Sequence, residues 1–209
     1  MNDPAATAAT VFVVDDEPSV RQALSRLFRL ASLNVAAFES AQAFLEGHDP
    51  STPGCLLLDL AMPGLSGLEL QEALAGRGSR LPIIFLTGHG DLPSGVTAMK
   101  RGAVDFLTKP IDAADLMEAV RGAIEKDRSA RRAHAELTEI QRRFATLTPR
   151  EYEVLCHVVS GALNKQIAAN LGTTEKTIKV HRSRVMEKAK VGSLAELVTL
   201  AVRAGIQPS

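Results

Sequence analysis

The sequence predicts a doubly wound α/β domain with a five-stranded parallel sheet of the flavodoxin-like kind, followed by a small all-α domain on a long linker helix. Three observations predict this architecture. Five apolar runs of strand length alternate with helical patterns in the first half, only helical patterns follow residue 147, and the charge balance reverses between the halves. Strands that alternate with helices favour a parallel sheet covered on both faces.

The five predicted strands are separated by segments with recognisable helix starts. Pro18 fits the first turn of a helix. Ser66 and Glu69 have the spacing of a capping box, and Asp112 and Asp115 share that spacing with a weaker residue pair. We therefore place one helix after each strand. The apolar runs are Thr10 to Val14, Val35 to Phe38, Cys55 to Leu58, Pro82 to Leu86 and Val104 to Leu107.

The fifth helix is expected to continue past the edge of its domain. From about Asp112 the pattern stays helical through Leu147, because no Gly follows Gly122 and no Pro precedes Pro149. Two alternatives explain its apolar stripe: a linker paired as a coiled coil, or a single helix that packs on its own domains. The expected domains are 1–122, 123–145 (linker) and 146–209. The stripe consists of Ala130, Ala133, Leu137, Ile140, Phe144 and Leu147.

Four short helices are expected after residue 147. Two capping boxes, Thr148 with Glu151 and Ser193 with Glu196, begin the first and fourth of these helices. The second is expected at 165–171 and the third from about 175 to 190, and the turn at 171–173 between them gives the geometry of a helix-turn-helix. The caps of the second and third helices are expected at Asn164 and at Thr173 or Thr174.

Charge and composition narrow the classes of function. Residues 1–122 contain nine Lys and Arg against fifteen Asp and Glu, whereas residues 123–209 contain fifteen against nine. An acidic half suits a metal site and a basic half suits a polyanion. Cys55 and Cys156 lie in apolar stretches without neighbouring metal ligands, which favours reduced core thiols. No apolar run approaches membrane-spanning length, so we expect a cytoplasmic protein without a membrane partner.

Three carboxylates stand at the ends of two predicted strands. Asp15 and Asp16 follow the first strand, and Asp59 follows the third. Ligands of open parallel sheets bind outside the carboxyl ends of strands, so the three acids converge if these strands are neighbours. Two carboxylates about 4 Å apart repel by roughly 4 kcal/mol at an effective dielectric constant near 20. The cluster therefore calls for a cation, and oxygen ligands favour Mg²⁺, for which Mn²⁺ can substitute.

Two further side chains stand at strand ends. Thr87 follows the fourth predicted strand and Lys109 follows the fifth. A hydroxyl and an ammonium beside a metal cluster suit an anion with several oxygens, such as a phosphoryl group. One of the carboxylates would then act as a nucleophile and form an aspartyl phosphate. The spacing alone leaves open which carboxylate does so.

The first half resembles the receiver domain of two-component response regulators across residues 9–125. The resemblance is closest to the FixJ branch of that family, because Thr-Gly-His-Gly-Asp at 87–91 is typical of it. The resemblance implies that a sensor histidine kinase phosphorylates Asp59. The segments that resemble the family, in the family's order, are VFVVDDE at 11–17, LLLDLAMPGLSG at 56–67, PIIFLTGHGD at 82–91 and KRGAVDFLTKP at 100–110.

The resemblance also implies roles for the surrounding residues. Asp15 and Asp16 would serve the Mg²⁺, with Asp16, Asp59 and the main-chain carbonyl of Ala61 as its direct ligands. Thr87 and Lys109 would bind phosphoryl oxygens. Two possible roles remain for each of two further residues. Phe106 either changes rotamer together with Thr87 or belongs to the core, and His89 either assists dephosphorylation or is a solvated loop residue.

The second half resembles the LuxR-type DNA-binding domain across residues 147–202, with LTPRE, NKQIA and KTIKVHRSRVMEK as its strongest segments. On the third helix, Ile178, Val185 and Met186 are expected to face inward, whereas Lys188 and the other basic residues face outward. The resemblance places three residues at base edges in the major groove: Lys179, Val180 and Ser183. It assigns mainly phosphate contacts to five others: Lys165, Lys176, Thr177, Arg182 and Arg184.

The two resemblances together imply a phosphorylation-controlled transcription regulator. Phosphorylation would promote a homodimer that binds a double-stranded DNA operator with two half-sites, and RNA polymerase is a further candidate partner. In the FixJ branch the first dimer contact is the fourth helix and fifth strand. The fourth helix of the second domain is expected to expose apolar residues for a dimer contact or for its own core. These two sets are Val96, Met99, Lys100 and Val104, and Leu197, Val198 and Ala201.

Two other functions compete with this one. A Mg²⁺-dependent phosphatase or phosphotransferase would use Asp59 as its nucleophile on small molecules. Dehalogenase-type phosphatases, however, have a second acid two residues after the nucleophile, where this chain has Ala61, and the basic helix-turn-helix would have no task. The third alternative is DNA binding that does not depend on phosphate, with a vestigial receiver domain. The complete set of acids, Thr87 and Lys109 argues against it.

Overall fold

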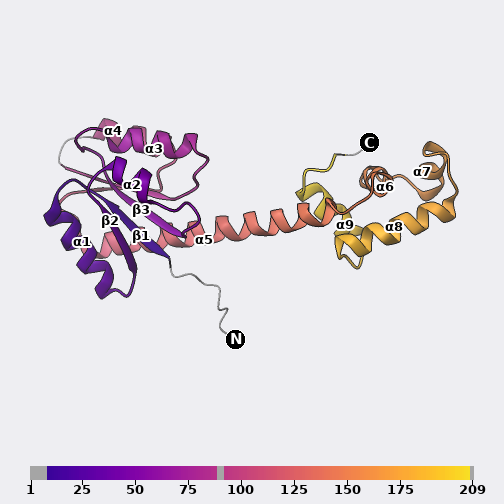
Figure 1. Cartoon of the computed structure of the whole chain (residues 1–209), viewed down its shortest axis with the longest axis horizontal. Coiled ribbons are helices and arrows are strands. Elements are labelled where there is room, and N and C mark those ends of the chain that lie inside the picture. The colour runs from indigo at the N-terminus through magenta and orange to yellow at the C-terminus, as the bar shows by residue number, and fades with distance from the viewer. Residues whose placement is uncertain (1–8, 89–91, 208–209) are drawn as a thin grey trace. The chain divides into compact units, whose positions relative to one another are not determined.

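A computed structural model describes residues 9–88 and 92–207 of the chain (Figure 1). The chain divides into two compact units, Met1–Arg131 and Arg132–Ser209. Helix α5 (Ala113–Phe144) is one unbroken helix that contributes residues to both units. Within the described residues, no helix is long and apolar enough to cross a lipid bilayer.

The first unit is built on a five-stranded sheet in which every pairing is parallel. The strand order is β2-β1-β3-β4-β5, which confirms the predicted doubly wound fold. In the register of β1 with β3, Val14 pairs with Leu58, so the two strands end side by side. The strands are β1 (Thr10–Val14), β2 (Asn34–Phe38), β3 (Gly54–Asp59), β4 (Ile83–Thr87) and β5 (Asp105–Thr108).

Helices cover both faces of this sheet, as the alternating pattern predicts. Side chains of a strand alternate between its faces, so Val11 and Val13 lie in one core with α1 and α5, whereas Phe12 and Val14 lie in the other with α2, α3 and α4. Strand β3 is buried along its whole length between the two cores. The other helices are α1 (Pro18–Leu30), α2 (Ala41–Gly47), α3 (Gly67–Gly76) and α4 (Leu92–Lys100).

Local capping sets where these helices begin. Pro18 is the first residue of α1, and Ser66 with Glu69 forms the predicted capping box of α3. The carboxylate of Asp112 accepts hydrogen bonds from the main-chain N–H groups of Ala114 and Asp115 at the start of α5.

The last turns of α5 account for part of its apolar stripe. The helix ends at Phe144, three residues before the expected Leu147. Ile140 and Phe144 are buried in the core of the second unit, so this part of the stripe packs on its own domain. Pairing of two linkers through Ala130, Ala133 and Leu137 stays a prediction, as do the boundaries at 122 and 146; the two compact units divide between residues 131 and 132.

The second unit is a bundle of short helices around the end of α5. Val154, Ile167, Ile178 and Val185 form its core with Ile140 and Phe144 of α5. The turns after α6 and α7 contain Gly161 and Gly172 at positive φ (81° and 60°), which glycine adopts without strain. The helices are α6 (Pro149–Val159), α7 (Asn164–Asn170), α8 (Glu175–Ala189) and α9 (Leu194–Arg203).

Three of the four predicted caps in this unit are confirmed. Thr148, Thr174 and Ser193 each accept a hydrogen bond from a main-chain N–H three residues later. The predicted cap Asn164 is wrong. It is the first helical residue of α7, because Leu163 precedes the helix and the side chain of Gln166 accepts from the Leu163 N–H.

Candidate functional site

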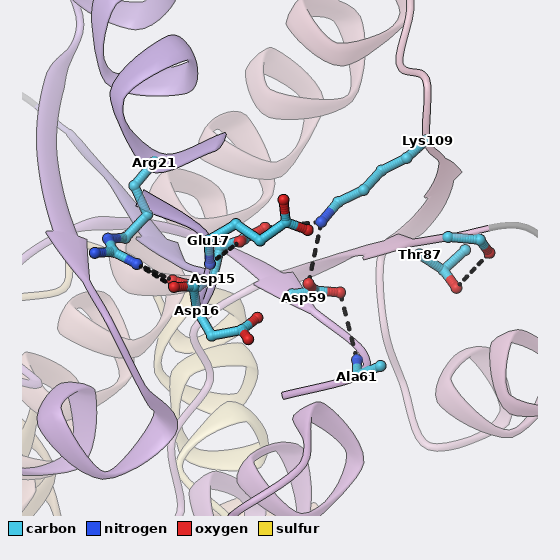
Figure 2. Close-up of polar contacts among 9 residues, drawn as sticks. Asp15, Asp16, Glu17, Arg21, Asp59, Ala61, Thr87 and Lys109 are labelled. Atoms are coloured by element: carbon cyan, nitrogen blue, oxygen red, sulfur yellow. Dashed lines mark hydrogen bonds and ion pairs between the residues drawn. The ribbon is translucent and has the colours of Figure 1, made fainter. Parts of the chain in front are cut away.

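The three strand-end acids meet at the carboxyl edge of the sheet, as predicted (Figure 2). Asp15, Asp16 and Asp59 each place one carboxylate oxygen within 4.8 Å of the others. This follows from the pairing of β1 with β3, which brings the two strand ends together. Asp15 and Asp59 are buried and Asp16 is half-buried, so two of the charges are largely removed from water.

Two residues that the sequence interpretation missed hold the acidic turn in place. The main-chain N–H of Glu17 donates to the Asp15 carboxylate at 2.8 Å. The Arg21 guanidinium donates to the main-chain carbonyls of Asp15 and Asp16, each at 2.8 Å. An arginine in the first turns of a surface helix is common, so its spacing gives no specific signal of this role.

Lys109 lies between two of the acids. Its Nζ is 2.9 Å from Asp15 Oδ2 and 3.0 Å from Asp59 Oδ2. Burial raises the pKa of Asp59, against the opposing effect of Lys109. Burial also acts to lower the pKa of Lys109, but its hydrogen bonds to the two carboxylates keep that pKa above its ordinary value. Lys109 is therefore the cation that stabilises the buried charge of this cluster.

Of the other predicted site residues near Asp59, Ala61 contacts its carboxylate and Thr87 hydrogen-bonds elsewhere. Asp59 Oδ1 accepts a long hydrogen bond (3.3 Å) from the Ala61 N–H. The buried Thr87 donates its hydroxyl to the main-chain carbonyl of Gly88 at 3.1 Å. Gly67 begins α3 directly behind the site, where an added Cβ would lie 2.4 Å from the Asp59 main-chain oxygen.

Phe106 packs as its core alternative predicts, and a change of rotamer together with Thr87 stays a prediction. Phe106 is half-buried and packs against the core on the α4 side of the sheet. A Cβ added to Gly95 of α4 would lie 2.5 Å from its ring, so this glycine leaves the space that the ring occupies. His89 lies outside the described residues. On α4, Val96 and Met99 are 54% and 44% exposed, and Lys100 is exposed. Val104, directly before β5, is half-buried against the other core, on the α1 and α5 side of the sheet.

The charges and donor types of the acidic cluster fit a divalent cation. Three carboxylates and one ammonium leave two uncompensated negative charges in a partly buried site. All the side-chain donors are hard oxygen atoms, which Mg²⁺ and Mn²⁺ prefer over softer ligands.

Helix α8 of the second unit separates an apolar face from a polar face. Ile178, Val185 and half-buried Met186 pack into the core, as predicted. Of the residues predicted to contact DNA, Lys176, Lys179, Val180, Ser183 and Arg184 are exposed on α8 and Lys165 is exposed on α7; Glu175 and Glu187 of α8 are exposed as well.

Three α8 side chains bind within the unit. Half-buried Arg182 donates to Asn164 Oδ1 of α7 at 2.5 Å, which joins the two helices of the helix-turn-helix. The hydroxyl of Thr177 is 2.9 Å from that of Thr174. The expectation that Lys188 faces outward is wrong. Its Nζ binds Glu151 at 2.6 Å and the Thr146 carbonyl at 3.2 Å, because the buried Glu151 carboxylate attracts it inward.

The expected exposure of the apolar α9 residues is wrong for two of the three. Leu197 and Ala201 are 1% and 0% exposed and belong to the core of the second unit, and Val198 is half-buried against that core. Packing against α6 and α8 uses this face of α9. The apolar residues that α9 does expose are Leu194 (43%) and Val202 (62%).

Both halves of the chain match known protein families. Residues 11–121 match the response regulator receiver domain, and residues 145–201 match the luxR family of bacterial regulatory proteins. Nodulation protein W of Bradyrhizobium diazoefficiens is 47% identical over 97% of this chain and 89% of that protein. The transcriptional regulatory protein FixJ of Azorhizobium caulinodans is 43% identical over 95% of this chain and 94% of that protein.

Solved structures of response regulators are also similar to this chain. The response regulator StyR is 45% identical with a TM-score of 0.86, and the match covers 94% of this chain and all of StyR. Full-length FixJ from B. japonicum is 40% identical with a TM-score of 0.57, over 95% of this chain and 98% of that one. These similarities lend no support to a small-molecule phosphatase. The chain belongs to the response regulators, transcription regulators in which a receiver domain is joined to a LuxR-type DNA-binding domain.

Proposed function

We propose that a sensor histidine kinase phosphorylates Asp59 and that the phosphorylated chain binds its DNA operator more tightly. The observation that carries this proposal is the convergence of three carboxylates and Lys109 at one sheet edge, in a chain that also exposes a basic recognition helix. The complete set of acids, Thr87 and Lys109 supports a working switch over a vestigial receiver domain.

Receiver domains generally bind Mg²⁺ at such an acidic cluster, and we assign the same ion to this one. Asp16, Asp59 and the main-chain carbonyl of Ala61 would be its direct ligands, and Asp15 would support it from the buried side. When bound, the ion balances the two excess negative charges and neutralises phosphoryl oxygens. Mn²⁺ offers the same coordination chemistry and substitutes for it.

In the proposed transfer, residues at this edge supply the nucleophile and the groups that bind phosphoryl oxygens, and the kinase supplies the phosphohistidine. An Asp59 carboxylate oxygen attacks phosphorus while the bond from phosphorus to the kinase histidine nitrogen breaks, and the histidine keeps that electron pair. Lys109 then exchanges its bond to Asp59 for a phosphoryl oxygen. The Thr87 hydroxyl leaves the Gly88 carbonyl for another phosphoryl oxygen, and Phe106 moves in the space beside Gly95.

The DNA contacts are assigned to the polar face of α8 and its neighbours. Lys179, Val180 and Ser183 lie outward on α8 and would approach base edges. Arg182 binds Asn164, so a phosphate contact would be made from a side chain already oriented by α7. The remaining phosphate contacts are assigned to Lys165, Lys176, Thr177 and Arg184.

Dimerisation would present two such helices to the two half-sites of an operator. Val96, Met99 and Lys100 are exposed on α4 and form the proposed contact of the phosphorylated receiver domains, together with the half-buried Val104 directly before β5. On α9, the exposed Leu194 and Val202 and the half-buried Val198 are the residues that remain for a second contact. RNA polymerase is the proposed partner of the DNA-bound dimer.

The decisive experiment labels the full chain with acetyl phosphate and Mg²⁺. Wild type should gain an acid-stable, base-labile phosphate, and Asp59→Asn should gain none because it lacks the nucleophile. Equal labelling of both proteins would exclude Asp59 as the acceptor. Operator binding measured before and after labelling then tests the coupling, and we expect tighter binding by wild type only.

A further inference from the structure

The face of α5 that packs on the receiver core ends in a partly buried ion pair. Leu116, Val120 and Ala123 line this face and lie in the core. Asp127 and Arg131 continue it at the next helical steps of four residues, so they project from the same side of the helix. The Asp127 side chain is 3% exposed and that of Arg131 is 36% exposed. A charged pair thus occupies the place where the apolar stripe would continue.

The pair binds the start of strand β3 and the loop before it. Asp127 Oδ2 accepts from the Gly54 N–H at 2.9 Å and from Arg131 Nε at 2.8 Å. The Arg131 guanidinium also donates to three successive main-chain carbonyls at 2.9 to 3.2 Å. A guanidinium offers five donors in a fixed plane, and here four of its hydrogen bonds are made. The three carbonyls belong to Pro50, Ser51 and Thr52.

Gly54 also lies very close to the main chain of β1, on the side away from Asp127. A Cβ added there would lie 1.9 Å from the Thr10 carbonyl oxygen, so the start of β3 is held between β1 and the Asp127 carboxylate. Strand β3 begins at Gly54 and ends at Asp59. The strand that carries the proposed phosphoacceptor at one end is therefore hydrogen-bonded to α5 at the other.

We propose that Asp127 and Arg131 are positioning residues that fix the linker helix to β3 and couple the phosphorylation state of the receiver domain to the DNA-binding domain. The two residues lie between the family matches, which end at residue 121 and resume at residue 145. Hydrogen-bond and salt-bridge networks together with rigid secondary-structure elements can carry energetic coupling between distant sites. Without the pair, α5 would lose its polar ties to β3 and to the 50–52 loop. This inference rests on the proposed function.

The test compares Arg131→Ala with Arg132→Ala in the full chain. Arg132 is the matched control, because it is the next residue of the same helix and forms an exposed ion pair with Glu136. Each protein is labelled with acetyl phosphate and Mg²⁺, and operator affinity is measured before and after labelling. Amide hydrogen exchange of Ser51, Thr52 and Gly54, the three residues of this segment that are not proline, reports whether the Arg131 contacts hold the segment in place. Arg131→Lys, which keeps the charge but has fewer donors, serves as a milder variant if Arg131→Ala does not fold.

We expect phosphorylation to tighten operator binding by wild type and by Arg132→Ala by roughly 5- to 150-fold, the usual range of coupling between sites. Arg131→Ala should be phosphorylated as fully as wild type and should bind the operator with wild-type affinity before labelling. Phosphorylation, however, should increase its operator affinity hardly at all. The amides of Ser51, Thr52 and Gly54 should exchange faster in Arg131→Ala, and Arg131→Lys should lie between Arg131→Ala and wild type.

Two outcomes would overturn the inference. Faster exchange with a full phosphorylation gain would show that the contacts only stabilise the fold, and unchanged exchange would show that they do not hold the loop. If wild type itself labels but gains no affinity, the proposed function fails and the coupling fails with it. In that case, the hydrogen-exchange result for Arg131→Ala still shows whether Asp127 and Arg131 fix α5 to the start of β3.

Discussion

At the scale of single residues, Glu151 shows how much one side chain can organise. Its carboxylate accepts from the Thr148 N–H at 2.8 Å to complete the capping box of α6, and it binds Lys188 of α8 at 2.6 Å. The side chain is 3% exposed. These hydrogen bonds, that of Lys188 above all, lower the pKa of Glu151 from its ordinary 4.5 to about 2.

This lowered pKa predicts how the stability of the DNA-binding domain depends on pH. Above pH 4.5 the ionised Glu151 contributes fully to stability. As pH falls from 4.5 towards 2, the unfolded chain takes up a proton that the folded domain does not, so this contribution is lost. Glu151→Gln should lower the melting temperature at neutral pH, and its difference from wild type should shrink over that pH range. The near-UV signal of Tyr152, the single tyrosine in a chain without tryptophan, reports this transition.

Glu139→Gln is the matched control. The pKa of Glu139 is also lowered to about 2, by hydrogen bonds to Arg142 and Arg143, but this carboxylate lies at the surface, where water and salt screen it. We expect a much smaller loss of stability at neutral pH. A loss as large as that of Glu151→Gln would contradict the importance of burial.

At the scale of elements, α8 performs two tasks with two faces. Ile178, Val185 and Ala189 are buried and hold the helix in the domain, while Lys179, Val180, Ser183 and Arg184 on the opposite side are exposed. Lys179 and Val180 are adjacent and both outward, so they form a natural pair for comparison. One carries a charge and the other does not.

Lys179→Ala should weaken operator binding and reduce the slope of log affinity against log salt concentration by about one, because one fewer counterion is released. Val180→Ala should leave that slope unchanged and alter only the preference among operator sequences. Binding titrations over a range of salt concentrations measure both. If Lys179→Ala matches wild type in affinity and slope, the proposed recognition face is misplaced.

At the scale of the whole molecule, α5 belongs to the cores of both units. Its first half packs under the receiver sheet through Leu116, Val120 and Ala123. Its last turns place Ile140 and Phe144, each 6% exposed, in the DNA-binding core. A domain boundary at residue 146 would therefore remove part of that core.

A fragment of residues 132–209 should be more stable than one of residues 146–209. Burial of a large apolar side chain contributes about 1.5–3 kcal/mol, so the loss of Ile140 and Phe144 should lower the free energy of unfolding by roughly 3–6 kcal/mol. Urea denaturation followed at Tyr152 measures the difference. Equal stability of the two fragments would show that these residues add nothing to the domain.

The sequence by itself determined the fold class and the acidic cluster. The apolar runs of β1 and β3 have strand length and end in Asp15 and Asp59, and parallel strands bring their carboxyl ends to one edge whatever the details of packing. Capping boxes such as Ser66 with Glu69 were also predictable, because all their atoms lie within one turn of helix.

Only the tertiary structure decided which neighbours each side chain meets. Periodicity marks Leu197 and Ala201 as apolar but does not say whether the domain itself or a second copy covers them, and the structure buries both. Lys188 turned inward because Glu151 of another helix lies beside it. The one sequence signal for Asp127 and Arg131 was a pair of opposite charges on the helix face that Leu116, Val120 and Ala123 begin. Their partners, Gly54 and the 50–52 loop, lie more than 70 residues away along the chain, where no local pattern reaches.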